Sequence, residues 1–225
     1  MSDKKTIKGQ IQKFQVSLTE EQKLAKSKIL LKKITLLKGL AGTSKTFLAV
    51  NVALDLLFRK EVKKIVITRP FVYAEDGDAE VGILPGNIDD KLKGITNPVY
   101  DNMYKLTSKE TIDKLIEEGV ISVMPISFMR GETIDDAVLI IDEAQNCKLS
   151  AIYTALSRIS ETTKTIITGD PLQCDLKRKS DSGFNFFYFL NQLNDFEIIE
   201  LTEQHRSKLV NDITRLYIEY KNQKT

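Results

Sequence analysis

The chain has 225 residues, 42% of them hydrophobic and 28% charged, and a formal net charge of +2 at pH 7. This suits one globular domain with a buried core, and we find no apolar run of about 18 residues that would predict a transmembrane helix. Two cysteines and one histidine make a disulfide framework or a zinc site improbable. The N-terminus lacks the apolar segment of a secretory signal, so we expect a cytoplasmic protein.

Positive charge gathers at the start of the chain. The first 38 residues hold ten lysines against three acidic residues, which leaves the remainder net negative. We expect residues 1–17 to form a basic, flexible arm and residues 18–225 to form a single domain. Such an arm can contact nucleic-acid phosphates, but a solvated leader has the same composition, and both interpretations stay open.

Helical patterns and apolar runs alternate along the chain. Thr19 is expected to cap a first helix. The expected helices cover residues 20–32, 45–58, 150–159, 183–193 and 207–220, together with a largely helical stretch at 88–118 that Pro98 interrupts. The expected strands cover residues 33–38, 64–68, 120–124, 137–141, 165–168 and 197–201. This order predicts an α/β fold, a mostly parallel sheet with helices on both faces.

The segment GLAGTSKT, residues 39–46, joins a predicted strand to a predicted helix, which is the context of a phosphate-binding P-loop. Glycines let backbone N–H groups turn towards phosphates, and the helix N-terminus adds positive partial charge. Lys45 would reach the terminal phosphates, and the Thr46 hydroxyl would bind Mg²⁺. Ser44 stands where the motif expects glycine, and a glycine turn with a chance Lys-Thr pair is the simpler alternative. The predicted nucleotide-binding residues here are Gly39, Leu40, Ala41, Gly42, Thr43, Ser44, Lys45, Thr46 and Phe47.

Acidic and amide side chains follow two later strands. Asp142 is placed to hold Mg²⁺, and Glu143 is placed to orient or deprotonate an attacking water. Gln173, shortly after a strand that ends near Asp170, could contact the γ-phosphate or its water, although a plain Gly-Asp-Pro turn is the alternative. Because ligands of parallel sheets lie beyond the carboxyl ends of the strands, we expect these residues and the P-loop to form one ATP site.

The long segment 69–87 separates a strand from the next helical stretch. Arg69, Phe71 and Tyr73 could stack on single-stranded bases. Four acids in the segment would repel phosphate, so packing of the rings within the loop is the favoured interpretation. The single histidine, His205, is expected to support the site by hydrogen bonding.

Several motifs carry a resemblance to known proteins. Leu18-x-x-x-Gln22-x-x-Ala25, DEAQN at residues 142–146 and GDPLQ at residues 169–173 resemble the first motor domain of superfamily 1 helicases. A more particular set resembles the PhoH-like family of single-domain RecA-like P-loop ATPases, found in bacteria and often in bacteriophages. That set comprises Arg69-Pro70, GILPG at 82–86, FMRG at 128–131 and His205-Arg206.

The resemblance spans residues 18–215 and implies roles for matching positions. Gln22 would read the adenine edge, and Gln173 would sense the γ-phosphate. Two positions depart from the family pattern. Ser44 replaces a usual glycine, which puts nucleotide affinity or turnover in question, and Ile83 replaces a usual phenylalanine.

The resemblance further implies an ATPase that acts on single-stranded RNA or DNA as a helicase-like motor. Superfamily 1 helicases bind ATP between two such domains, so a single domain needs an arginine finger in trans. We therefore expect a head-to-tail homo-oligomer, a hexameric ring as in the family, with Arg130 and Arg206 as candidate fingers. The alternative is a slow ATP-dependent regulatory or scaffold switch that does not separate strands.

Overall fold

The computed structural model describes residues 14, 16–70, 88–129, 131 and 133–222. The segment 71–87, which holds two of the aromatic residues and the GILPG motif discussed above, lies outside the described residues. So do Arg130 and most of the predicted N-terminal arm. The division into an arm and one domain therefore stays a prediction.

Six parallel strands form one sheet in the order β3-β2-β4-β5-β1-β6. They are β1 (Ile34–Gly39), β2 (Lys64–Arg69), β3 (Ile121–Pro125), β4 (Ala137–Ile141), β5 (Lys164–Gly169) and β6 (Phe196–Leu201). All five residues of β4 are buried, as expected for a strand covered on both faces. The sheet order places the carboxyl ends of β4, β5 and β1 next to one another.

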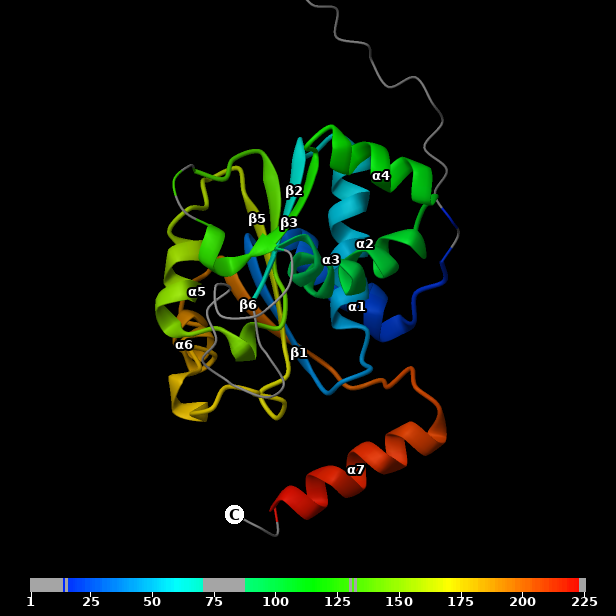
Figure 1. The fold of residues 1–225 in the computed structure, drawn as a ribbon, viewed down its shortest axis with the longest axis vertical. Helices are drawn as coiled ribbons and strands as arrows, with labels where there is room; N and C mark the ends of the chain where they lie inside the picture. The colour runs from blue at the N-terminus through cyan, green and yellow to red at the C-terminus, as the bar shows by residue number, and fades with distance from the viewer. Residues whose placement is uncertain (1–13, 15, 71–87, 130, 132, 223–225) are drawn as a thin grey trace, which may run out of the picture.

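Helices cover both faces of the sheet (Figure 1). One face carries α1 (Glu20–Leu31), α2 (Lys45–Phe58), α3 (Ile88–Tyr104) and α4 (Lys109–Glu117), and the other carries α5 (Leu149–Leu156) and α6 (Asn185–Leu190). Side chains of β4 alternate between the two cores. Val138 and Ile140 pack with the α2 side, whereas Leu139 and Ile141 pack with the α5 side. The predicted α/β fold is confirmed.

The interruption predicted at Pro98 is wrong. Helix α3 continues through Pro98 to Tyr104, and the break falls between α3 and α4, where Ser108 caps α4 by accepting a hydrogen bond from the Thr111 backbone. The fully buried side chains of Val99 and Met103 hold the helix against the core after the proline. Tertiary packing thus outweighs the one backbone hydrogen bond that proline removes.

Two other helices are shorter than the sequence pattern predicts. The helix expected over 150–159 ends at Leu156, and the one expected over 183–193 is regular only from Asn185 to Leu190. Short 3₁₀ turns also lie at Ile126–Phe128, Ala144–Asn146 and Lys179–Asp181.

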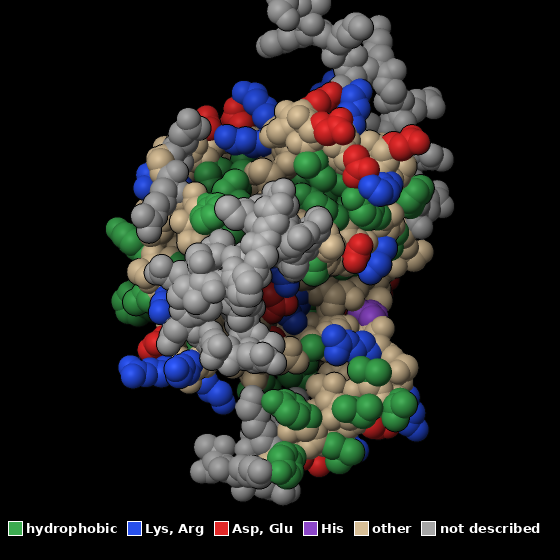
Figure 2. All heavy atoms as spheres, in the orientation of Figure 1, with side chains coloured by type: hydrophobic (Ala, Val, Ile, Leu, Met, Phe, Trp, Pro, Cys, Tyr) green, Lys and Arg blue, Asp and Glu red, His purple; other side chains and the backbone are tan. Residues whose placement is uncertain are grey.

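The last helix, α7 (Lys208–Asn222), extends away from the body of the domain (Figure 1). Hydrophobic side chains lie open on it (Figure 2). Leu209, Ile213 and Leu216 share one helical face and are each more than half exposed. Within the part of the chain that the structure describes, no helix combines the length and the apolar character that crossing a membrane requires.

Candidate nucleotide-binding site

The loop between β1 and α2 is shaped by two glycines. A Cβ on Gly39 would lie only 2.4 Å from the Leu201 carbonyl oxygen and 2.7 Å from Thr43 Oγ1, so no side chain fits there. Gly42 has φ of +90°, a conformation that glycine adopts freely. Thr43 Oγ1 donates to the Leu40 carbonyl at 2.9 Å and closes the turn. The predicted P-loop residues thus form one compact turn between strand and helix.

Ser44 occupies the left-handed region, with φ of 60° and ψ of 27°, directly before α2. For a residue with a Cβ this conformation costs about 1–2 kcal/mol, whereas glycine adopts it without that cost. The serine therefore keeps the backbone shape that the motif's usual glycine would take.

Lys45 extends its amine back over the loop. Its Nζ donates to the carbonyls of Gly39 at 2.8 Å and Leu40 at 2.9 Å. Burial lowers the pKa of this amine, and the nearby carboxylates, Asp170 foremost, partly oppose the shift. A half-buried cation at the N-terminus of α2 suits binding of a phosphate chain.

Thr46 and Asp142 meet across the site. Thr46 Oγ1 donates to Asp142 Oδ1 at 2.7 Å, and the Thr168 hydroxyl donates to the same oxygen. Asp142 is 1% exposed, and its Oδ2 lies 3.0 Å from Arg69 Nε. A buried carboxylate beside a hydroxyl offers hard oxygen donors of the kind that Mg²⁺ prefers.

A metal at this position would have few protein ligands among the described residues. Among the described residues there is no group of three or more His, Cys, Asp or Glu side chains able to bind one. This fits Mg²⁺, which usually takes one or two protein ligands and completes its shell with phosphate oxygens and water. Thr46 and Asp142 would be those two ligands.

Glu143 faces the pocket from the turn after β4, in the left-handed region with φ of 55°. Gln145 Nε2 donates to its Oε2 at 2.6 Å, and Arg69 Nη2 lies 3.8 Å from its Oε1. Burial raises the pKa of this carboxyl, and the neighbouring Asp142 raises it further. A carboxylate whose proton affinity is raised in this way is suited to accept a proton.

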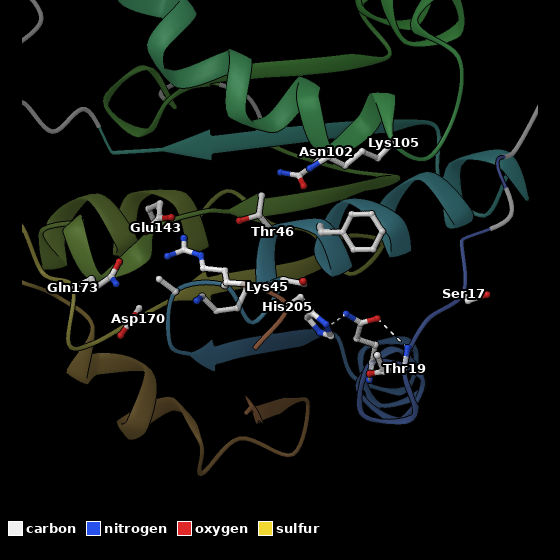
Figure 3. A pocket seen from close by; sticks show the side chains of 16 residues that line it. Ser17, Thr19, Lys45, Thr46, Asn102, Lys105, Glu143, Asp170, Gln173 and His205 are labelled. Atoms are coloured by element: carbon white, nitrogen blue, oxygen red, sulfur yellow. Dashed lines mark hydrogen bonds between the residues drawn. The ribbon is translucent and has the colours of Figure 1, made fainter. Parts of the chain in front are cut away.

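The β5 end adds two side chains to the same edge. Asp170 is 2% exposed and accepts a hydrogen bond from the Leu172 backbone at 3.0 Å. The Gln173 backbone N–H donates to the Asp170 carbonyl at 3.0 Å, which makes a tight turn. Figure 3 shows Asp170, Gln173 and Glu143 together on one side of Lys45. The structure thus brings Gln173 to the phosphate end of the site.

The opposite end is built from the start of α1. The predicted cap at Thr19 is confirmed. Its hydroxyl accepts from the Gln22 backbone at 3.3 Å, and Gln22 Oε1 accepts from the Thr19 backbone at 3.1 Å. With its oxygen engaged, the Gln22 amide turns its nitrogen to His205 Nε2 at 3.2 Å (Figure 3). His205 Nε2 is then the acceptor of this hydrogen bond.

Arg206 lies against the phosphate loop of its own chain. A Cβ on Gly42 would be 2.8 Å from Arg206 Cδ and 2.9 Å from its Nε. The side chain is therefore next to the P-loop of its own chain. The other candidate finger, Arg130, lies outside the described residues.

Most of these groups line one cavity of about 640 Å³, whereas Asp142, Arg69 and Gln145 are not among its lining residues. Asn102 of α3 and Lys105, directly after that helix, form a wall of it that the sequence did not predict (Figure 3). They follow no motif and reach the site only through the packing of α3. Of the predicted loop residues, Gly39, Leu40 and Thr43 shape the turn rather than the wall. The lining residues are Ser17, Thr19, Gln22, Ala41, Gly42, Ser44, Lys45, Thr46, Phe47, Asn102, Lys105, Glu143, Asp170, Gln173, His205 and Arg206.

A parallel sheet with a P-loop after β1 and an acid after β4 defines a RecA-like P-loop NTPase fold. The family model described as PhoH-like protein matches residues 16–218. The chain belongs to this family. Both the family and the fold support nucleotide binding.

Curated relatives agree with that assignment. The chain is 38% identical to a PhoH-like protein of Mycobacterium bovis over 185 residues, which cover 81% of this chain and 52% of the relative. It is 37% identical to a PhoH-like protein of Bacillus subtilis over 182 residues, 80% of this chain and 56% of the relative. The chain thus spans about half the length of the curated relatives it matches.

Solved structures share the fold at low sequence identity. The large terminase of a thermophilic bacteriophage, solved in complex with ADP, matches with a TM-score of 0.55 and 12% identity. That match covers 88% of this chain and 50% of the terminase chain. At this identity the likeness is one of fold alone.

Proposed function

We propose that this protein is a Mg²⁺-dependent ATPase. The observation that carries the proposal is the hydrogen bond between Thr46 and Asp142, with Glu143 one residue further along and facing the same cavity. It joins the first residues of the P-loop helix to the end of a strand almost a hundred residues later. A chance Lys-Thr pair after a glycine turn would have no reason to meet a buried acid there.

Four side chains would act at the end of the site where the phosphates bind. Lys45 and Arg206 would balance the charge of the β- and γ-phosphates, and Thr46 with Asp142 would hold the metal. Bound Mg²⁺ would supply neutralisation of the charge on the transferred phosphoryl group.

Glu143 would activate the water. Its carboxylate accepts a proton as the water oxygen bonds to the γ-phosphorus and the bond from that phosphorus to the bridging oxygen of ADP breaks. Gln173, from the neighbouring turn, would orient the same water or the γ-phosphate. At the other end, Gln22 would read the edge of the adenine ring.

The proposal extends to single-stranded RNA or DNA as the partner and to a homo-oligomer, in the family's case a hexameric ring. The order of the helicase-like motifs supports the first. The exposed apolar face of α7 supports the second, because such patches mark interaction surfaces. A ring would also let a neighbouring chain supply an arginine finger.

A slow nucleotide switch is the second candidate. The strained Ser44 and the engagement of Lys45 by its own loop carbonyls favour it, because both would slow the assembly of a competent phosphate site. In that case the chain would bind ATP and change which partner it binds, without separating the strands of a nucleic acid.

Steady-state hydrolysis separates these functions. ATP turnover with Mg²⁺ is measured for the wild type and Glu143→Gln, with and without single-stranded RNA and DNA, beside native mass measurement. Loss of a general base costs typically 10²–10⁴-fold in rate, so we expect a fall of that order in Glu143→Gln with ATP binding retained. Equal turnover in both would contradict hydrolysis at this site. Turnover that no nucleic acid stimulates would favour the switch.

A further inference from the structure

The side chain of Gln145 lies 1% exposed between the turn after β4 and the turn after β5. Its Nε2 donates to Glu143 Oε2 at 2.6 Å and to the Gln173 carbonyl oxygen at 3.3 Å. Its Oε1 accepts from the Asp170 backbone N–H at 3.1 Å. One buried amide therefore bonds to three residues, each of which lines the nucleotide cavity.

The orientation of this amide follows from its partners. The Asp170 N–H can only donate and therefore requires the amide oxygen. The nitrogen is then left facing the Glu143 carboxylate and the Gln173 carbonyl, both of which can only accept. No flipped arrangement satisfies the three groups, and a buried polar group left unpaired is strongly destabilising. The amide is thus fixed in one orientation.

The partner turn is itself rigid. Asp170 accepts from the Leu172 backbone, and the Gln173 N–H bonds back to the Asp170 carbonyl. Since Gln145 is bonded to both ends of this turn, the turn and the Glu143 carboxylate are tied together. Neither can shift without straining a hydrogen bond of Gln145.

We propose that Gln145 is a positioning residue, which sets the Glu143 carboxylate relative to the Gln173 turn so that both address one water. This inference rests on the proposed ATPase function. Binding of ATP depends on the P-loop, to which Gln145 makes no hydrogen bond among the described contacts. Turnover depends on the distance between Glu143 and Gln173, which Gln145 spans.

The chain provides a matched control in the next residue. Asn146 is 8% exposed, and both the nitrogen and the oxygen of its side-chain amide form hydrogen bonds with Asp175. Its Nδ2 donates to the Asp175 carboxylate at 3.2 Å, and its Oδ1 accepts from the Asp175 N–H at 2.7 Å. Its side chain thus joins the same two segments as that of Gln145, but among the described contacts it bonds to no residue that lines the cavity. Removing it tests the cost of losing a buried amide alone.

The experiment measures kcat and the Kd for ATP in Gln145→Met, Gln145→Asn and Asn146→Leu. Methionine keeps the length of glutamine without its hydrogen bonds, and asparagine keeps the amide but is too short to span the three partners. For both Gln145 variants we expect kcat to fall about 10- to 100-fold, as small misplacements of catalytic groups do, with Kd within about threefold of the wild type. Asn146→Leu should leave both within about threefold. Thermal unfolding of each variant shows whether it is folded.

A double-mutant cycle decides whether Gln145 acts through Glu143. In the Glu143→Gln background, adding Gln145→Met should lower the residual kcat by less than about threefold, because the group being positioned is gone. An undiminished loss in that background would overturn the inference, as would equal kcat losses in Gln145→Met and Asn146→Leu. If Glu143→Gln lowers turnover and the Gln145 variants do not, the inference fails while the ATPase proposal stands. Absence of turnover in the wild type would overturn both.

Discussion

Ser44 holds a backbone conformation that glycine adopts freely and that serine adopts only at a cost. Its side chain makes no capping bond to α2, so nothing in the helix N-terminus offsets that cost. The strain is stored where phosphate would bind, a place where strained residues are commonly found. The residue therefore bears directly on turnover.

Ser44→Gly should retain or raise ATPase activity. The substitution removes a left-handed strain of about 1–2 kcal/mol and leaves the backbone N–H in place. Thermal stability should change little, because glycine also gains freedom in the unfolded chain. Ser44→Ala is the matched control, since it keeps the Cβ and loses only the hydroxyl, and it should behave like the wild type in kcat. Complete loss of activity in Ser44→Gly would mean that the loop has another role.

His205 should act on nucleotide affinity and not on turnover. His205→Leu removes the acceptor that holds the Gln22 amide, a loss of about 1 kcal/mol, so the KM for ATP should rise roughly fivefold. The kcat should stay within about twofold. His205→Gln restores an acceptor and should recover part of the affinity. A kcat defect at unchanged KM would place His205 in the chemistry and contradict this role.

Whether a site residue can be predicted depends on whether its neighbours in the sequence mark its position. The placement of Lys45, Thr46 and Asp142 at one edge of the sheet could be predicted, because a glycine loop and an acid at a strand end are both marked in the local sequence. Asn102 and Lys105 could not, because they reach the cavity only through the packing of α3 on the sheet. No local pattern marks that contact.

Gly39 shows how tightly the elements constrain the loop. Gly39→Ala would set a Cβ 2.4 Å from the Leu201 carbonyl, which belongs to the neighbouring strand β6. Overpacking of this kind costs about 1–3 kcal/mol, so the melting temperature should fall by roughly 3–10 °C. ATP binding should weaken as the loop shifts.

Gly119→Asn is the control for that prediction. Gly119 is exposed, with φ of +70°, and no heavy atom lies within 4 Å of a Cβ placed there. Asparagine tolerates this region, so stability should change by less than about 1 kcal/mol. If the two variants melted alike, the close approach of β6 to the loop would not be what requires a glycine at position 39.

At the scale of elements, the strands were predictable because each is a short run rich in apolar residues, and the central strands β2, β4 and β5 are almost wholly buried. The boundaries of the helices were less predictable than the strands. Pro98 predicted a break that packing of Val99 and Met103 overrides, and the true break carried its own signal in Ser108, a cap residue followed by acidic and polar positions. The local preference of proline is overridden here because the side chains that follow it in the helix are buried in the core.

For the whole molecule, the order of the strands in the sheet decides which loops meet at the site. Placing β5 between β4 and β1 brings the acids after β4, the turn after β5 and the P-loop after β1 to one edge. The parallel sheet was predictable, but the strand order was not, since it depends on crossovers that leave no mark in the sequence. The contacts of Gln145 follow from that order.

The placement of Arg206 leads to a prediction about the assembled molecule. Because the side chain lies against its own Gly42, we expect it to act in cis. Mixing inactive Arg206→Ala chains with inactive Glu143→Gln chains should then restore no ATPase activity, because no site in a mixed oligomer holds both groups. If Arg130 is the finger in trans, mixing Arg130→Ala chains with Glu143→Gln chains should recover activity. The Arg130→Ala chains keep Glu143 in their own sites, and a neighbouring Glu143→Gln chain supplies the Arg130 that those sites need. Recovery in the Arg206→Ala mixture would show that Arg206 serves a neighbouring chain.

Specific activity should also fall on dilution as the oligomer dissociates, and undiminished turnover from a species with the mass of one chain would contradict a shared site.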